Sequence, residues 1–299
     1  MKKNQPHKAF SLIEISIVIL IIGILISGVS LGVDLYKDFR IASAKSLIQN
    51  SRVGRINDLV LWLEASQKSS FEPSDIKDGQ RITKWKNINQ NILPQERVLN
   101  DANPTTATGP FFREQVVGNL PSIEFTPNED QCLWVGSGFD GASKNSSIYL
   151  LIRTKEDWVD TNQPRLLSRI LNPTQYSIWD IRSNVLVYSN GDISSNPYSY
   201  MGIYKINPTS TVLHELIIDR KNAISYNIIG NANGYGVSGL VNDTFIGSYA
   251  SQGLSIRCGG GLNKASAYYS EIIIFERALN SKERDDVKDY LIKKWNIKK

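Results

Sequence analysis

The sequence predicts a long N-terminal α-helix followed by an all-β antiparallel head that ends in a short helix. Three observations predict this organisation: a 24-residue apolar stretch near the start, a series of short β-rich runs separated by polar turns, and a capped amphipathic segment at the end. A chain of 299 residues suits a helical stalk plus one domain of roughly 200–240 residues. We therefore expect one stalk and one folded head.

The apolar stretch Phe10–Val33 carries one ionisable side chain, Glu14. As a helix rising about 1.5 Å per residue it spans roughly 36 Å, enough to cross a bilayer core. Lys2, Lys3 and Lys8 precede it, and basic residues hold that end in the cytoplasm. A cleavable secretory signal has an uncharged apolar core of only about 7–15 residues. We therefore expect residues 10–33 to span the membrane once.

The segment Lys8–Glu14, KAFSLIE, resembles the class III signal of type IV prepilins and pseudopilins. In that family a leader peptidase cuts before the Phe and methylates the new amino terminus, and a Glu is the fifth mature residue. The resemblance implies a leader over residues 1–9, a cut between Ala9 and Phe10, and N-methylation of Phe10. Ala9 stands where the family usually has Gly. The implied partners are the prepilin peptidase, other pilin or pseudopilin subunits, and inner-membrane lipid before assembly.

Physical arguments give Glu14 a role in assembly independently of the resemblance. A carboxylate in hydrocarbon costs at least a few kcal/mol unless it is paired. No cationic side chain lies within Phe10–Val33, so the nearest cation after cleavage would be the α-amine of Phe10, in the same or a neighbouring chain. A protonated Glu14 near the membrane interface is the alternative. Gly28 and Gly32 form a GxxxG pair, which lets helices approach closely during subunit assembly.

The helical pattern continues beyond the apolar stretch without a break. Residues 34–56 keep a rough helical period of apolar side chains with charged residues between them, and no proline occurs between Phe10 and Pro73. We expect a projecting helix over 34–56 and a head over 57–299.

The head reads as short strands at roughly even spacing, which is typical of an antiparallel sandwich or barrel. The expected strands are Pro121–Phe125, Ser147–Arg153, Arg165–Ile170, Tyr176–Ile181, Val185–Tyr188, Leu213–Asp219, Ala223–Ile229, Phe245–Tyr249 and Ala267–Phe275. At the C-terminal end, Asn280 and Glu283 have the spacing of a capping box. An apolar face follows it, formed by Val287, Tyr290, Leu291 and Trp295.

Segments at the two ends of the head carry a second resemblance. They are Leu61–Ser66, Asp78-Gly79, Trp85–Asn87 and Leu120–Phe125 at its start, and Glu271–Phe275 with Tyr290–Trp295 at its end. Together they resemble the first and last parts of concanavalin-A-like, laminin-G-like jelly rolls. The resemblance implies a jelly-roll sandwich whose rim loops bind sugars or proteins, sometimes through calcium. Thr126-Pro127 departs from the Asp-Gly that the family often has there.

Few residues of the head can be assigned to a site. Asp140, Asn145 and Asp192 lie in polar loops whose composition suits calcium, the one cofactor we consider, and we assign no residue to a sugar or protein ligand. Cys132 and Cys258 are the only cysteines. They could pair in an oxidising compartment, but the sequence does not fix their distance.

Several function classes find no support in the sequence. The formal net charge is +5, and loss of the three leader lysines leaves +2, so we expect no nucleic-acid partner. Paired carboxylates at glycosidase spacing are absent, and so is a G-x-S-x-G elbow to accompany His214, which is the one histidine of the mature chain. From these absences we predict that the protein is not an enzyme.

Three functions remain. The first is a minor type IV pilin-like subunit whose head binds a surface glycan or protein. The second is a type II secretion pseudopilin that binds cargo or other pseudopilins, and the third and least favoured is a membrane-tethered carbohydrate-active enzyme. The first two predict a single-pass protein of the bacterial inner membrane with a cytoplasmic N-terminus. Its head would lie in the periplasm, or on the cell surface after assembly.

Overall fold

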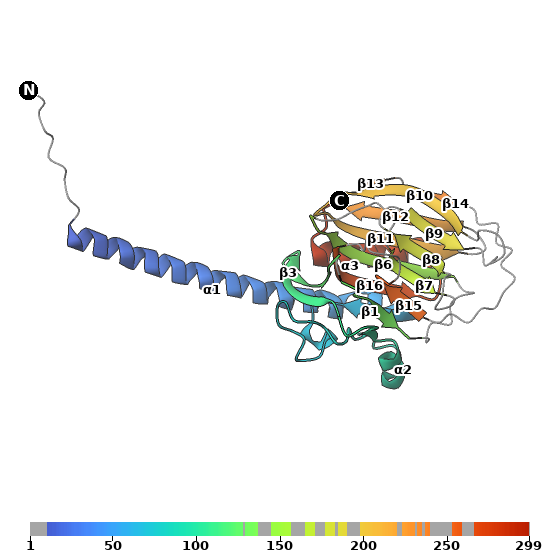
Figure 1. The fold of residues 1–299 in the computed structure, drawn as a ribbon, viewed down its shortest axis with the longest axis horizontal. Helices are drawn as coiled ribbons and strands as arrows, with labels where there is room; N and C mark the ends of the chain where they lie inside the picture. The colour runs from blue at the N-terminus through green and yellow to red at the C-terminus, as the bar shows by residue number, and fades with distance from the viewer. Residues whose placement is uncertain are drawn as a thin grey trace, which may run out of the picture.

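The computed structural model shows a long helix that projects from a β-sandwich head (Figure 1). The structure describes residues 11–127, 129–136, 145–156, 165–170, 177–182, 185–189, 198–219, 223–230, 232–234, 237–239, 253–258 and 266–298. Helix α1 runs over Leu12–Asn50, and a 3-10 turn, η1, follows over Val53–Arg55. The α-helix therefore ends earlier than the predicted residue 56. Ser51 is extended there, and its hydroxyl donates to the Ile48 carbonyl at 3.0 Å, a local hydrogen bond that competes with helix continuation.

The described strands of the head form two antiparallel sheets of eight strands each. Sheet 1 has the order β14-β12-β11-β6-β16-β4-β3, and β1 also pairs with β16; sheet 2 has the order β13-β10-β9-β8-β7-β15-β5-β2. The strands of sheet 1 are β1 (Leu59–Glu64), β3 (Phe111–Val117), β4 (Leu120–Phe125), β6 (Ser146–Thr154), β11 (Thr211–Asp219), β12 (Ala223–Gly230), β14 (Val237–Gly239) and β16 (Ala267–Phe275). The strands of sheet 2 are β2 (Ala102–Pro104), β5 (Leu133–Val135), β7 (Arg165–Ile170), β8 (Ser177–Arg182), β9 (Val185–Ser189), β10 (Tyr198–Ile206), β13 (Ala232–Gly234) and β15 (Gly253–Ile256). Helix α2 (Pro94–Leu99) and the turn η2 (Lys68–Ser70) lie in the connections.

Central strands of sheet 1 are buried on both faces. In β6, Ile148 and Leu150 belong to the apolar core between the sheets, whereas Tyr149 and Leu151 belong to a second core on the outer face. The same division holds in β11 and β16. Alternate side chains of a strand point to opposite faces, so a strand covered on both sides reads as a continuous apolar run.

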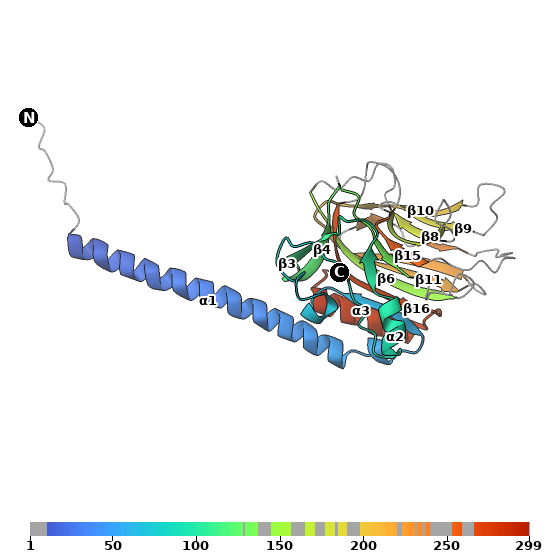
Figure 2. The ribbon, with the colours of Figure 1, turned by 60° about the horizontal axis from the view of Figure 1, so that its bottom comes forward.

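The outer core is closed by two helices that lie on the same side of the sandwich (Figure 2). Helix α3 spans Ser281–Trp295 and begins with the predicted capping box, in which Asn280 and Glu283 each bond the other's backbone N–H. Its apolar face packs on the outer core through Val287, Tyr290, Leu291 and Trp295. The C-terminal part of α1 adds the buried Ala44, with Ile41, Leu47 and Ile48 packed beside it.

The predicted fold class is confirmed, and most predicted strands match described ones within two residues. The expected strand Phe245–Tyr249 lies outside the described residues. The sequence did not predict β3, because its charged residues and a bulge between Arg113 and Val117 hide the strand period. Gln115 lies in this bulge and has a φ of 54°.

Candidate functional site

Within the described residues, no other part of the chain covers the first half of α1. Every residue from 11 to 36 is exposed. In the described part of the chain, α1 is the one helix long and apolar enough to span a membrane. The cleavage-site residues Ala9 and Phe10 lie outside the described residues.

Two of the predicted assembly features lie on this uncovered segment. Glu14 belongs to the N-terminal cap of α1, where its carboxylate accepts a hydrogen bond from the Ser11 N–H at 2.8 Å. Gly28 and Gly32 have open space around them, since a Cβ added at either position would meet no atom within 4 Å. Glu14, Gly28 and Gly32 are therefore open to partners outside the chain, and their roles in assembly stay predictions.

The second half of α1 is attached to the head by polar contacts. Arg40 donates to the Gly118 carbonyl from Nε at 3.0 Å and from Nη2 at 2.7 Å, and Nη2 also donates to the Lys294 carbonyl at 3.1 Å. Lys37 forms an ion pair with Glu114 on β3. These contacts join α1 to the β3–β4 turn and to the end of α3.

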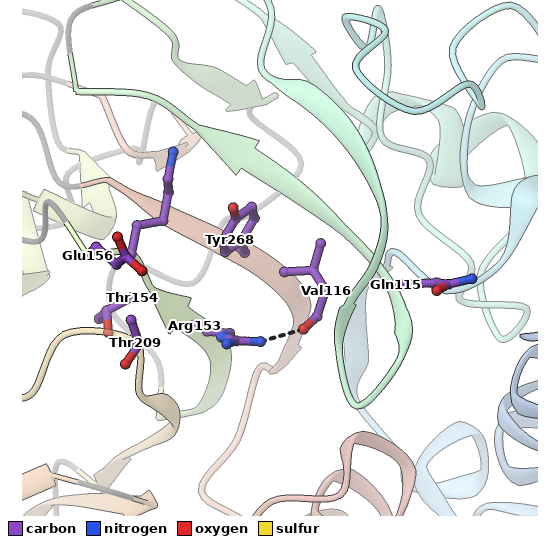
Figure 3. A pocket seen from close by; sticks show the side chains of 8 residues that line it. Gln115, Val116, Arg153, Thr154, Glu156, Thr209 and Tyr268 are labelled. Atoms are coloured by element: carbon purple, nitrogen blue, oxygen red, sulfur yellow. Dashed lines mark hydrogen bonds between the residues drawn. The ribbon is translucent and has the colours of Figure 1, made fainter. Parts of the chain in front are cut away.

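A pocket of about 570 Å³ opens on the outer face of sheet 1, at the end where β6 stops and β16 starts (Figure 3). Its lining comes from four segments: the bulge of β3, the end of β6 with the two residues after it, the turn before β11, and the start of β16. The lining residues are Gln115, Val116, Arg153, Thr154, Lys155, Glu156, Thr209 and Tyr268.

Strand register places the central residues of this pocket in one row. Tyr268 on β16 is directly opposite Glu124 on β4 and Arg153 on β6. Directly paired residues of neighbouring strands point to the same face, so the three side chains stand side by side across the sheet. Arg153 Nη1 donates to the Val116 carbonyl at 2.7 Å, which links the row to the bulge of β3 (Figure 3).

Charged side chains surround this row. Glu124 is buried and pairs with both Arg113 and Lys155, so two cations share one carboxylate. The Lys155 ammonium lies 5.7 Å from the centre of the Tyr268 ring. Burial and the nearby Glu124 carboxylate raise the pKa of Tyr268, so its hydroxyl stays protonated at neutral pH. Arg113 also pairs with Asp78, whereas Arg153 forms no ion pair with the described residues.

Two backbone positions at the rim have an uncommon conformation. Gln115 has a φ of 54° and Thr209 a φ of 59°, both in the left-handed region that residues with a side chain seldom adopt. Such conformations are costly, and they concentrate at functional sites. Both residues line the pocket, which marks this end of the sheet as a candidate binding site.

Other residues singled out in the sequence lie elsewhere. Cys132 and Cys258 form a disulfide, with their Cα atoms 4.8 Å apart, beside the paired strands β5 and β15. His214 is buried within the sandwich, its Nδ1 2.5 Å from the Tyr226 hydroxyl, and burial lowers its pKa to about 3.

The calcium prediction falls mostly outside the described part of the chain. Asp140 and Asp192 are not among the described residues, and Asn145 lies immediately before β6. Calcium binding at these loops therefore stays a prediction.

Sequence reasoning missed every residue that lines the pocket. They come from segments up to about 150 positions apart, and no local motif joins them. The sequence feature that could have helped to find the pocket is the strand prediction. It gives the strands Ser147–Arg153 and Ala267–Phe275, but it does not say which residues of the two strands lie opposite each other.

Comparisons with known proteins match the N-terminal segment and the head separately. Residues 4–30 match the model of the prokaryotic N-terminal methylation motif. No curated protein matches the chain by sequence. The chain therefore has a type IV pilin-type N-terminus.

Solved structures resemble the head. The binding domain of Botulinum neurotoxin serotype D matches with a TM-score of 0.54 at 11% identity, covering 81% of this chain and 53% of that one. Trypanosoma rangeli sialidase in complex with sialic acid matches with a TM-score of 0.50 at 13% identity, covering 80% of this chain and 33% of that one. A mutant of this sialidase displaying trans-sialidase activity has a TM-score of 0.50 at 11% identity, covering 90% and 40%. This chain thus spans a third to about half of those proteins.

The N-terminus and the fold together define a class, that of pilin- or pseudopilin-type subunits with a β-sandwich head. The motif implies processing by a prepilin peptidase, assembly with other pilins, and anchoring in a membrane. At this low identity, the likeness of the head shows the fold alone.

The prediction that the protein is not an enzyme is overturned, because sialidases are among the structures that resemble the head. It rested on missing motifs of other enzyme families, and the absence of those motifs does not exclude catalysis on this fold. The fold by itself also assigns no catalytic residue to this chain.

Proposed function

We propose that this chain is a minor subunit of a type IV pilus-type filament, whose head binds a ligand outside the cell. In this proposal, residues 10–33 hold the chain in the inner membrane before assembly and pack among other subunits afterwards. The cytoplasmic leader is removed between Ala9 and Phe10, and Glu14 then pairs with the amine of Phe10 in a neighbouring subunit.

One observation carries the proposal: the apolar half of α1 is exposed from residue 11 to residue 36, whereas the other half packs on the head. So much exposed apolar surface needs a bilayer or other helices to cover it. A pilin-type subunit meets both partners in turn. The large head supports a minor role, because a major subunit must pack at high density along the filament.

Mass spectrometry of the chain from membrane, periplasmic and sheared-surface fractions of the native cell tests the proposal. We expect a chain that begins at methylated Phe10 and occurs in the sheared fraction. Processed chains confined to the periplasmic side would instead support a type II secretion pseudopilin. A chain that begins near Met1 and occurs in membranes alone would overturn filament assembly.

A matched pair of variants tests the role of Glu14. Glu14→Gln removes the charge within the apolar stretch, and Asp34→Asn does the same just beyond it. We expect Glu14→Gln to leave processed chain in the membrane and to remove it from the sheared fraction, whereas Asp34→Asn assembles as the parent does. Equal recovery of both variants in the sheared fraction would contradict the pairing.

A further inference from the structure

We propose that the pocket at the end of sheet 1 binds a saccharide that carries one carboxylate, such as a hexuronic acid residue. The Tyr268 ring would lie against the face of the sugar and the Arg153 guanidinium against its carboxylate. This inference rests on the proposed ligand-binding head and gives it a site and a ligand class.

The row of side chains supplies the two groups that such a ligand needs. An aromatic ring offers a flat apolar face with a polar tip, which suits the C–H face and the hydroxyls of a pyranose ring. A guanidinium matches a carboxylate in shape and can donate two parallel hydrogen bonds. Tyr268 and Arg153 are cross-strand partners, so the sheet holds these groups side by side. Figure 3 shows both residues at the same opening.

The charge balance favours one carboxylate over a more highly charged group. Arg113 and Lys155 pair with Glu124, and Arg113 also pairs with Asp78. Arg153 forms no ion pair with the described residues and donates to the Val116 carbonyl, so it is the cation that a ligand carboxylate would meet. The single carboxylate of a uronate would pair with Arg153, whereas a phosphate monoester would bring up to two negative charges close to Glu156. Glu156 is exposed and can accept hydrogen bonds from sugar hydroxyls.

The shape of the pocket agrees with a small ligand. Its volume of about 570 Å³ lies within the range of roughly 300–1,000 Å³ that small-molecule sites occupy. The two left-handed residues Gln115 and Thr209 stand on opposite sides of the row, on β3 and on the turn before β11. Thr209 has a hydroxyl at the rim that a sugar can bond, whereas the Gln115 side chain points away from the row (Figure 3).

The test measures binding of methyl galactosiduronic acid, a monosaccharide with one carboxylate, and of its methyl ester to the detergent-solubilised full-length chain by titration calorimetry. The ester keeps the sugar ring and removes the charge. We expect the acid to bind at least tenfold more tightly than the ester, since a hydrogen-bonded charge pair is being lost. Raising the salt concentration should weaken binding of the acid and leave binding of the ester unchanged.

Variants locate the site. Arg153→Gln and Tyr268→Ala should each weaken binding of the acid about tenfold or more. Tyr268→Phe keeps the ring and should bind within about threefold of the parent. Arg97→Gln on α2, outside the pocket, is the control for a general loss of charge. Thermal unfolding of each variant shows whether the head stays folded. The salt dependence is measured on the parent chain, so it tests the charge pair even where a variant does not fold.

Equal binding of acid and ester, or no binding of either at millimolar concentration, would overturn the proposal. Equally tight binding of acetyl-triglycine, which carries a carboxylate without a sugar, would also overturn it and would indicate a peptide ligand. Failure here leaves the proposed filament function standing, because processing and surface shearing are measured without any ligand.

Discussion

Helices α1 and α3 pack on the same outer face of the sandwich, yet they are attached to it in different ways. Helix α3 places a lysine, Lys294, in the interior with none of its side chain exposed. Helix α1 contacts the head through the partly exposed Lys37 and Arg40 and a short apolar patch around Ala44. The difference indicates that α3 is part of the folded head, whereas α1 is docked on it and leaves half its length for other partners.

The interior contacts of α3 form a fully buried charged network. The Lys294 ammonium donates to Glu64 at 2.6 Å on β1 and to Glu271 at 2.9 Å on β16. Glu271 also accepts hydrogen bonds from Trp62 Nε1, Trp295 Nε1 and the Tyr290 hydroxyl. Buried charges are tolerated when they are paired and hydrogen-bonded, and this network satisfies both conditions.

The largest effect is expected where this network is broken. Lys294→Met removes the cation that two buried carboxylates share, and the loss of one partner from a buried pair costs about 3–5 kcal/mol. We expect the thermal unfolding midpoint of the head to fall by roughly 6–20 °C. Lys293→Met, on the exposed side of the same turn, is the control. Equal shifts for the two variants would show that the network does not hold α3.

Removing the disulfide tests the stability of the head through a change in neither α1 nor α3. The Cys132–Cys258 disulfide closes a loop with a sequence separation of 126. Replacing both cysteines by serine should cost about 2–4 kcal/mol, because the unfolded chain gains freedom. The urea midpoint measures this loss, and a reductant should lower the parent's midpoint without affecting the variant. A parent that is unaffected by the reductant would contradict a stabilising disulfide.

Acid should weaken the sandwich interior through His214. Burial lowers its pKa from 6.5 to about 3 in the folded head, so below pH 6.5 unfolding takes up a proton. The contribution of neutral His214 to the free energy of unfolding is full above pH 6.5. It falls by about 1.4 kcal/mol per pH unit down to about pH 3. Between pH 6.5 and pH 5 the loss is about 2 kcal/mol. Urea unfolding at both pH values should show a smaller loss for His214→Gln, and identical losses would rule out this source.

What the sequence predicts well is what local pattern decides. The apolar stretch, the runs of β6 and β16 and the Asn280–Glu283 cap each depend on neighbouring residues, and each was found in the structure. The pocket could not be predicted, because it depends on β-sheet register: Arg153 and Tyr268 are opposite each other only through pairing of strands far apart in the chain. The cysteine pairing stayed open for the same reason.

The smallest effect is expected at the junction of α1 with the head. Arg40→Gln removes three hydrogen bonds, two to the Gly118 carbonyl and one to the Lys294 carbonyl. The Arg40 side chain is partly exposed and Lys37 still pairs with Glu114. We therefore expect the contact between α1 and the head to weaken by about 1–2 kcal/mol, with the head itself unchanged. Amide hydrogen exchange at residues 118–120 should rise about tenfold while the unfolding midpoint of the head moves little.

Arg55→Gln, an exposed change just beyond α1, controls for the loss of a surface charge. A Cβ built at Gly118 would lie 2.6 Å from the Trp295 carbonyl oxygen, so the β3–β4 turn touches α3 as well as α1. Amide exchange at Gly118 is therefore a sensitive reporter of how tightly α1 is held on the head. If Arg40→Gln lowered the unfolding midpoint as much as Lys294→Met, α1 would belong to the same cooperative unit as α3. A local rise in exchange alone would mean that the head unfolds as a unit of its own and that α1 is held on it by a local contact.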